Sequence, residues 1–340
     1  MYVLAGDLGG TKTLLQIAEV RDASYCVVRE ERYASADFDS LVPMITAFLH
    51  THNPGRAYEI EGACLGVAGP VVESGSTQAA KLTNLPWKLE SGEIARVLAI
   101  TQVRLINDFQ AIGYGIAALG ADDIVTLQAG QMQARAPRIT LGAGTGLGQG
   151  VLIWRDDYYE ALPTEGGHAG FAPADVLQMD LLRYLHARFG RVSCERILSG
   201  AGFVLIYQFL RERGDYPESK KLAAATAEGD PAPAITHAAL VDRDPLAIQA
   251  VDLFLRIYGA HAGDVALTLL ATGGVYIAGG IAAKMITAVQ AGGFIRAFND
   301  KGRMSPLTQA MPVHVVMNPQ VGVMGAALMA ARTAKDPDRT

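Results

Sequence analysis

Cysteine is scarce in this chain of 340 residues, which contains only Cys26, Cys64 and Cys194. An odd number of widely separated cysteines provides no disulfide framework, and their spacing matches no zinc-binding pattern. We therefore expect each of the three to be a small core residue of a protein that works in a reducing compartment, the cytoplasm.

Runs of basic residues are also lacking. The chain carries 29 Lys and Arg residues against 34 Asp and Glu residues, which gives a formal net charge of −5. This balance provides no electrostatic footprint for nucleic acid or for an anionic membrane surface. It favours a small neutral or phosphorylated substrate.

We expect neither an export signal nor a membrane span. The amino terminus shows no basic leader followed by a long apolar stretch and a small-residue cleavage site. The most hydrophobic stretch, Val265–Ala283, is interrupted by Gly273-Gly274 and Gly279-Gly280. This pattern predicts a buried helix that passes into a central strand.

Glycine and apolar residues, by contrast, are plentiful. The 37 glycines are spread along the chain and 50% of the residues are hydrophobic, which predicts a well-packed globular protein with many tight turns. The length exceeds that of a usual single core and predicts two domains.

The most informative segment is a glycine turn between two strands near the amino terminus, Gly6-Asp7-Leu8-Gly9-Gly10-Thr11-Lys12-Thr13. Gly9 and Gly10 let the backbone approach an anion closely or take positive φ, so that successive N–H groups can point at a phosphate. Thr11 and Lys12 add a hydroxyl donor and a positive charge, and Asp7 can hold Mg²⁺ through water. A hairpin whose glycines serve only the turn is the alternative.

A second segment repeats this design. Leu141–Gly148 reads Leu-Gly-Ala-Gly-Thr-Gly-Leu-Gly and lies between two further strands. Two such hairpins suggest an internal duplication in which each half offers a phosphate loop to one nucleotide. A third candidate, Gly279-Gly280, ends an apolar strand and could lie against a base or ribose, although such a pair is also typical of helix packing.

Periodicity and turn residues predict alternating strands and helices. Strands are expected near 2–8, 13–20, 25–33, 62–68, 103–106, 123–128, 138–143, 148–154, 275–278 and 313–316. Helices are expected at about 39–52, 91–98, 174–189, 201–213, 231–241, 245–271 and 321–332, with one more just after Asn107-Asp108 that connects the domains. The segment 222–234 is interpreted as an Ala/Pro-rich surface connection.

Polar residues follow several of these strands, and ligands of α/β proteins gather at the carboxyl ends of strands. Asn107 and Asp108 follow the strand 103–106 directly. An amide and a carboxylate can hold vicinal hydroxyls, and the carboxylate can accept a proton from one of them. A helix N-cap pair is the alternative.

Two further candidates lie in the second half. Glu165 and His168 are held three residues apart by a Gly-Gly turn, so both can converge on a polyol. A metal site is discounted because the glycines break the helix and no second carboxylate-histidine set lies nearby. Glu195 precedes a Ser/Gly helix start, and by itself it is typical of a solvated or Arg-paired surface residue.

Together these segments resemble the bacterial glucokinase family of the sugar kinase, Hsp70 and actin superfamily over nearly the whole chain. The matching segments are Asp7–Lys12, Ile106–Phe109, Leu141–Gly148, Thr164–His168, Glu195–Gly200 and Ile277–Ile281. The resemblance implies an α/β, two-domain actin-like ATPase (ribonuclease H-like) fold with a cleft between the domains. It places a small α/β domain at 1–110 plus about 318–340 and a large α/β domain at 111–317.

The resemblance also implies ATP-dependent phosphorylation of D-glucose at its 6-hydroxyl, with Asp108 as the catalytic base and a homodimeric assembly. The implied sugar ligands are Asn107, Asp108, Glu165, His168 and Glu195. The implied ATP-binding residues are Gly9, Gly10, Thr11, Lys12, Gly144, Thr145, Gly146, Gly279 and Gly280, with Asp7 holding Mg²⁺ through water.

One departure from the wider family is informative. Related repressors and kinases carry a zinc cluster of one His and three Cys after their Glu-x-x-His segment, whereas this chain has no Cys between Cys64 and Cys194. We therefore expect neither structural zinc nor, because a strand starts the chain, a DNA-binding helix-turn-helix. A kinase of another hexose (fructose, mannose or an N-acetyl amino sugar) and a non-catalytic sugar-sensing regulator or actin-like scaffold are the open alternatives.

Overall fold

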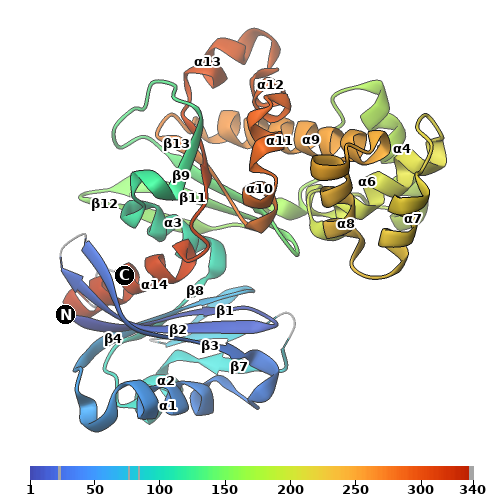
Figure 1. Cartoon of the computed structure of the whole chain (residues 1–340). Coiled ribbons are helices and arrows are strands. Elements are labelled where there is room, and N and C mark those ends of the chain that lie inside the picture. Colours follow the sequence, from blue (N-terminus) through green and yellow to red (C-terminus); the bar gives the residue numbers. More distant parts are fainter. Residues whose placement is uncertain (22–23, 76, 83–84, 337–340) are drawn as a thin grey trace. The chain divides into compact units, whose positions relative to one another are not determined.

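A computed structural model describes residues 1–21, 24–75, 77–82 and 85–336, and the chain divides into two compact units (Figure 1). Unit 1 comprises Met1–Asp123, Tyr158–Pro163 and Asn318–Thr340. Unit 2 comprises Ile124–Asp157 and Thr164–Met317.

Unit 1 is built on a mixed sheet. The unit as a whole contains the strands β1 (Tyr2–Leu8), β2 (Lys12–Arg21), β3 (Ser24–Ala34), β4 (Ile60–Val67), β5 (Val71–Ser74), β6 (Thr77–Lys81), β7 (Lys88–Glu90), β8 (Val103–Asn107) and β12 (Tyr158–Pro163). Its helices are α1 (Leu41–His52), α2 (Ser91–Leu98), α3 (Asp108–Gly115) and α14 (Val321–Lys335). The main sheet has the order β3-β2-β1-β4-β8, in which β1, β4 and β8 are parallel and β2 is antiparallel to both of its neighbours.

Alternation along β1 decides which helix covers which face of this sheet. Leu4 and Leu8 join the core cluster that contains α1 and α2, whereas Val3 and Ala5 join the cluster that contains α14. Figure 1 shows α1 and α2 on one face of the sheet and α14 on the other. Since successive side chains of a strand point to opposite faces, Asp7 lies on the α14 face.

Unit 2 combines a second sheet with most of the helices. Its strands are β9 (Ile124–Gln128), β10 (Arg138–Ala143), β11 (Leu147–Arg155), β13 (Gly274–Ala278) and β14 (Val313–Val316). Its helices are α4 (Val176–Phe189), α5 (Cys194–Ile197), α6 (Gly200–Arg213), α7 (Lys220–Ala227), α8 (Pro231–His237), α9 (Pro245–Leu269), α10 (Gly280–Lys284), α11 (Ile286–Gln290), α12 (Gly293–Asn299) and α13 (Ser305–Ala310).

The two sheets repeat one topology. In unit 1 the hairpin β2-β1 is followed by the parallel strands β4 and β8, and in unit 2 the hairpin β11-β10 is followed by the parallel strands β13 and β14. This repetition agrees with the internal duplication inferred from the two glycine turns. Each sheet therefore presents a hairpin turn at the carboxyl end of a strand that also pairs with a parallel neighbour.

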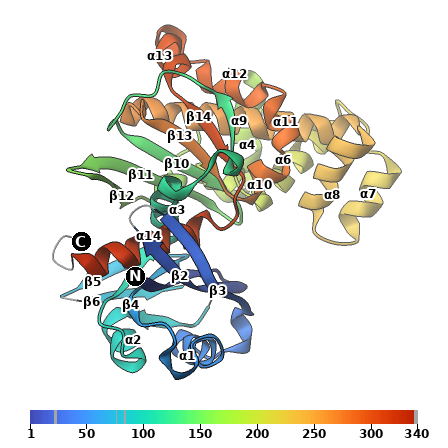
Figure 2. The same cartoon turned by 60° about the vertical axis from the view of Figure 1, so that its left-hand side comes forward.

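The long helix α9 organises the core of unit 2. It packs against β10 and also against α6 and α8 (Figure 2). Phe254 and Tyr258 of α9 form edge contacts with Phe203 and Phe294. The buried Tyr258 hydroxyl accepts a hydrogen bond from the Ala143 N–H (3.1 Å) and donates one to the Leu141 carbonyl (3.3 Å), which fixes the end of β10.

Along the chain, unit 1 first gives way to unit 2 between Asp123 and Ile124, whereas the boundary expected from the sequence lies between residues 110 and 111. The helix expected to connect the domains, α3, belongs to unit 1 because it packs tightly on α14. A Cβ added at Gly115 would lie 1.9 Å from the Val321 carbonyl oxygen, and a Cβ added at Gly325 would lie 1.8 Å from the Ala111 carbonyl oxygen.

Several local predictions were wrong. The presumed surface connection at 222–234 contains most of α7 and the start of α8, and Leu222 is buried. Cys26 is exposed because it lies on the edge strand β3, while Cys64 and Cys194 are buried as expected. The small sheet β5-β6-β7 was not predicted.

The hydrophobic stretch Val265–Ala283 does pass from the end of α9 into the central strand β13, as predicted. Among the residues that the structure describes, no helix combines the length and apolarity that a membrane crossing requires.

We predict that Tyr258→Phe destabilises unit 2, because it leaves the Ala143 N–H and the Leu141 carbonyl buried without their partner. Such a loss costs about 1–3 kcal/mol, which lowers the thermal midpoint by about 2–10 °C. The matched control is Tyr184→Phe, which loses one exposed hydrogen bond to Glu212. Calorimetry that finds the two variants equally stable would contradict the role given to Tyr258.

Candidate active site

The first glycine turn closes the β1–β2 hairpin of unit 1. The Gly9 N–H donates to the Lys12 carbonyl (3.0 Å), and Leu8 pairs with Thr13. A Cβ added at Gly9 would lie 2.9 Å from the Lys12 carbonyl oxygen, so the hairpin turn itself favours glycine at this position. Thr11 and Lys12 are exposed, which leaves their hydroxyl and ammonium groups accessible to a ligand.

Asp7 lies one residue before the end of β1 and is half-buried. Burial raises the pKa of its carboxyl, and the positive charge of Arg32 opposes that rise. The carboxylate lies beside the first turn of α14, since a Cβ added at Gly322 would be 3.9 Å from Asp7 Cγ. Its oxygens are of the kind that Mg²⁺ prefers.

Asn107 and Asp108 occupy the junction between β8 and α3. The Asn107 Oδ1 accepts a hydrogen bond from the Phe109 N–H (2.9 Å), and the Gln110 Oε1 accepts one from the Asn107 N–H (3.0 Å). This is a capping box, so the helix-cap alternative applies to Asn107. The Asn107 Nδ2 also donates to the Gly69 carbonyl (3.2 Å) and carries a second hydrogen.

Asp108 is the first residue of α3 and is half-buried. Its Oδ1 accepts a hydrogen bond from the Phe109 N–H (2.9 Å). A carboxylate in the first turn of a helix interacts favourably with the helix dipole, which stabilises its charged form. The charged form is the one that can accept a proton.

In unit 2 the structure brings Glu165, His168 and Glu195 together. Gly166–His168 forms a 3-10 turn, and it places the His168 Nε2 3.7 Å from the Glu165 Oε2. The His168 Nδ1 lies 3.7 Å from the Glu195 Oε1. The side chains of Glu165 and His168 are 69% and 58% exposed, so the two carboxylates and the imidazole form an accessible polar cluster. Glu165 and His168 therefore lie side by side, and their role as sugar ligands stays a prediction.

Glu195 also holds the second glycine turn. Its Oε2 accepts a hydrogen bond from the Leu147 N–H (3.0 Å), directly after Gly144-Thr145-Gly146. A Cβ added at Gly146 would lie 2.5 Å from the same oxygen, so a larger residue there would displace the Glu195 carboxylate. The surface interpretation of an isolated Glu195 was therefore wrong, because one carboxylate serves both the polar cluster and the turn.

Two more glycine segments of unit 2 meet at this turn. Gly279 has a φ of 83°, and a Cβ added to it would lie 2.7 Å from the Ala143 carbonyl oxygen. The Gly200 N–H, at the start of α6, donates to the Gly144 carbonyl (2.9 Å). Cβ atoms added at Gly144 or Gly280 would meet nothing within 4 Å, so both positions border open space.

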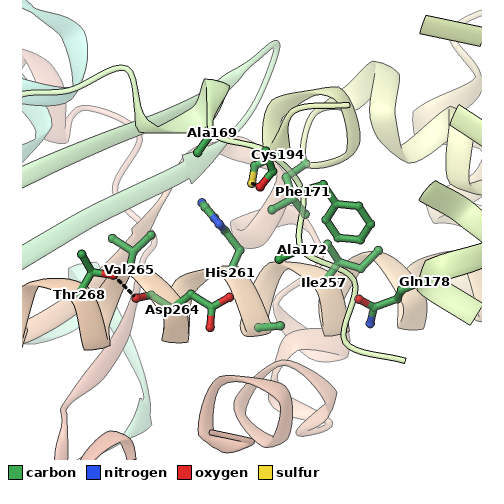
Figure 3. Close-up of a pocket in the computed structure, with 13 residues that line it drawn as sticks. Ala169, Phe171, Ala172, Gln178, Cys194, Ile257, His261, Asp264, Val265 and Thr268 are labelled. Carbon is green, nitrogen blue, oxygen red and sulfur yellow. Dashed lines mark hydrogen bonds between the residues drawn. The ribbon is translucent and has the colours of Figure 1, made fainter. Parts of the chain in front are cut away.

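A cavity of about 240 Å³ lies behind the polar cluster, between α9 and the segments that contain Ala169 and Cys194 (Figure 3). The His261 imidazole points into this space, and its buried Nε2 has no hydrogen-bond partner within the described chain. Burial lowers the pKa of His261 and raises the pKa of the Cys194 thiol to about 11. None of the predicted site residues lines this cavity.

Sequence reasoning missed the backbone N–H of Leu147 and the buried side chain of Ser35, whose Oγ donates to the Gly9 carbonyl (3.0 Å). Leu147 lies in the second glycine segment, but its contact with Glu195 is 48 residues away in the sequence, and Ser35 lies outside every motif and contacts Gly9, 26 residues away. Within residues 1–21, 24–75, 77–82 and 85–336, no group of three or more His, Cys, Asp and Glu residues is arranged to hold a metal ion.

Comparison with known proteins gives consistent matches. The family model described as "Glucokinase" matches residues 4–333. A protein named Glucokinase from Trichormus variabilis is 48% identical over 345 aligned residues, which cover 97% of this chain and 99% of the relative.

Two solved structures were also compared with the chain. The glucokinase from an Antarctic psychrotroph is 29% identical, covers 97% of this chain and 99% of its own, and superimposes with a TM-score of 0.82. The ROK family glucokinase from Streptomyces griseus, solved with glucose and AMPPNP, is 20% identical, with coverages of 98% and 100% and a TM-score of 0.64. The second likeness shows the fold alone.

We predict that Glu195→Ala exposes the Leu147 N–H to exchange, because it removes the acceptor. A hydrogen bond to a charged acceptor is worth about 1.5–3 kcal/mol, so hydrogen-deuterium exchange at Leu147 is expected to accelerate about 10- to 100-fold. Glu165→Ala is the matched control, since it removes the other carboxylate near His168 and leaves the Leu147 acceptor in place. Equal exchange at Leu147 in both variants would show that Glu195 does not hold the turn.

Proposed function

This chain belongs to the glucokinase family, and we propose that it transfers the γ-phosphoryl group of ATP to the 6-hydroxyl of D-glucose, with the Asp108 carboxylate as the general base. The observation that carries the proposal is the match to curated glucokinases over nearly the full length of the chain. The polar cluster of unit 2 and the two glycine turns support it, because they contain the residue types that a sugar and a triphosphate require.

We assign the sugar contacts to Asn107, Asp108, Glu165, His168 and Glu195. Glu165, His168 and Glu195 of unit 2 offer carboxylate acceptors and an imidazole within 3.7 Å of each other. Asn107 of unit 1 offers the second hydrogen of its Nδ2, because its Oδ1 caps α3. A site that pairs each hydroxyl disfavours the wrong epimer, which leaves buried groups unpaired.

Phosphoryl transfer depends chiefly on positioning and on stabilisation of charge. We assign the phosphate contacts to Gly9–Lys12 in unit 1 and to Gly144–Gly146 in unit 2, with Gly279 and Gly280 against the nucleoside. Asp108 accepts the proton of the attacking hydroxyl, a role worth about 10²- to 10⁴-fold in rate.

The residues present fit a magnesium ion held through water. Mg²⁺ keeps several waters and takes one or two carboxylates besides the substrate phosphates. Asp7 supplies a half-buried carboxylate at the end of β1, on the strand that enters the glycine turn; burial raises the pKa of this carboxyl, and the positive charge of Arg32 opposes that rise. The ion would neutralise charge on the phosphates, while Asp7 would orient its waters.

The homodimer and the cytoplasmic location stay predictions that rest on family resemblance and composition. Mass photometry of the purified chain tests the first of them. The assays below distinguish the proposed glucokinase from a sugar sensor or scaffold and from a kinase of another hexose.

We predict that Asp108→Asn lowers kcat by about 10²- to 10⁴-fold while glucose affinity stays within a few-fold, because the amide keeps the shape and cannot accept the proton. Coupled ADP-release kinetics measure kcat, and isothermal titration calorimetry measures glucose affinity. Asp122→Asn, at an exposed position of unit 1, is the matched control. A loss in kcat of less than tenfold with sugar binding retained would show that Asp108 is not the base.

A substrate panel tests the function itself. We expect ADP release with ATP to depend on glucose, with kcat/KM for glucose at least tenfold above the values for mannose, fructose and N-acetylglucosamine. Repeating the panel with ADP or polyphosphate in place of ATP determines which phosphoryl donor the enzyme uses. Binding of glucose without any ADP release would favour the sensor, and a higher kcat/KM for another hexose would reassign the substrate.

A further inference from the structure

Ser35 is a fully buried residue at the end of β3 that binds the first glycine turn at two points. Its Oγ donates to the Gly9 carbonyl (3.0 Å), and its backbone N–H donates to the Thr11 carbonyl (3.0 Å). The hydroxyls of Ser35 and Thr13 lie 3.1 Å apart. Because the single Ser35 hydroxyl hydrogen goes to Gly9, Thr13 is the donor in that pair.

The two hydrogen bonds from Ser35 to the Gly9 and Thr11 carbonyls orient two peptide planes of the turn. A trans peptide is planar, so the N–H of each residue points opposite to the carbonyl before it. With the Gly9 carbonyl bound to Ser35, the Gly10 N–H points away from Ser35. With the Thr11 carbonyl bound to Ser35, the Lys12 N–H also points away from it.

We propose that Ser35 is a positioning residue for the ATP phosphates. By holding the Gly9 and Thr11 carbonyls on one side, it keeps these electronegative oxygens away from an incoming phosphate and turns the Gly10 and Lys12 N–H groups toward the opposite side. Successive N–H groups held in this way form an anion-binding concavity. The assignment rests on the proposed function only in taking this turn as a nucleotide contact.

Ser35 and Thr13 differ in what they contact. Both side chains are fully buried, and both take part in the same hydrogen-bonded pair. Of these two side chains, the Ser35 hydroxyl is the one that donates to the Gly9 carbonyl. We therefore expect the loss of the Ser35 hydroxyl, and not that of Thr13, to weaken anion binding at the turn. Thr13→Val removes the Thr13 hydroxyl at nearly constant volume and leaves the bond from Ser35 to Gly9 in place, which makes it the matched control.

Calorimetric titration with a non-hydrolysable ATP analogue and Mg²⁺, and separately with glucose, tests the proposal. Ser35→Ala is expected to raise Kd for the nucleotide about 3- to 10-fold and to leave Kd for glucose within twofold, because one hydrogen bond that orients the turn is lost. Thr13→Val is expected to leave both constants within twofold. Ser35→Cys, which keeps the size and donates weakly, is expected to lie between wild type and Ser35→Ala.

An unchanged nucleotide Kd in Ser35→Ala would overturn the proposal, as would an equal loss in Thr13→Val or a parallel weakening of glucose binding. Should Ser35→Ala not fold, the same comparison between Ser35→Cys and Thr13→Val decides. Glucose-dependent ADP release by the wild-type chain is measured alongside. A wild type that binds the nucleotide but does not phosphorylate glucose refutes the proposed function, while the Kd values alone still decide the role of Ser35.

Discussion

The hydrogen bond between the Leu147 N–H and the Glu195 carboxylate is the constraint on which the site of unit 2 depends. One oxygen of this carboxylate holds the end of the turn Gly144–Gly146, and the other faces the His168 imidazole. A side chain at Gly146 would displace the Glu195 carboxylate, which occupies that space. A single carboxylate thus contacts both the second glycine turn and the polar cluster and fixes their relative position within one unit.

The two turns are held by different means although their strands repeat one topology. In unit 2 the supports are a carboxylate, the start of α6 and the buried hydroxyl of Tyr258. In unit 1 the support is Ser35, which binds carbonyl groups and leaves N–H groups on the other side. Both arrangements restrain a glycine-rich backbone that has little conformational preference of its own. The two sheets therefore share the hairpin, while each hairpin has its own restraint.

What could be predicted from the sequence was mainly local. The alternation of strands and helices, the two glycine turns and the convergence of Glu165 with His168 follow from short spacings along the chain. The contact between Glu195 and Leu147 spans 48 residues, and the one between Ser35 and Gly9 spans 26, so no motif reveals them. The placement of α3 in unit 1 depends on glycines that let it touch α14, a contact that the sequence of α3 alone cannot show. The exposure of Cys26 depends on the position of β3 at the sheet edge.

The general base is assigned to Asp108 and the other sugar contacts to Asn107, Glu165, His168 and Glu195, and a crystal structure of the chain with glucose and a non-hydrolysable ATP analogue tests this assignment most directly. We expect the Asp108 carboxylate within about 2.6–3.2 Å of the glucose 6-hydroxyl, with Glu165, His168 and Glu195 on the other hydroxyls. A sugar bound without these residues, or an Asp108 carboxylate still confined to the cap of α3 and remote from the 6-hydroxyl, would contradict it.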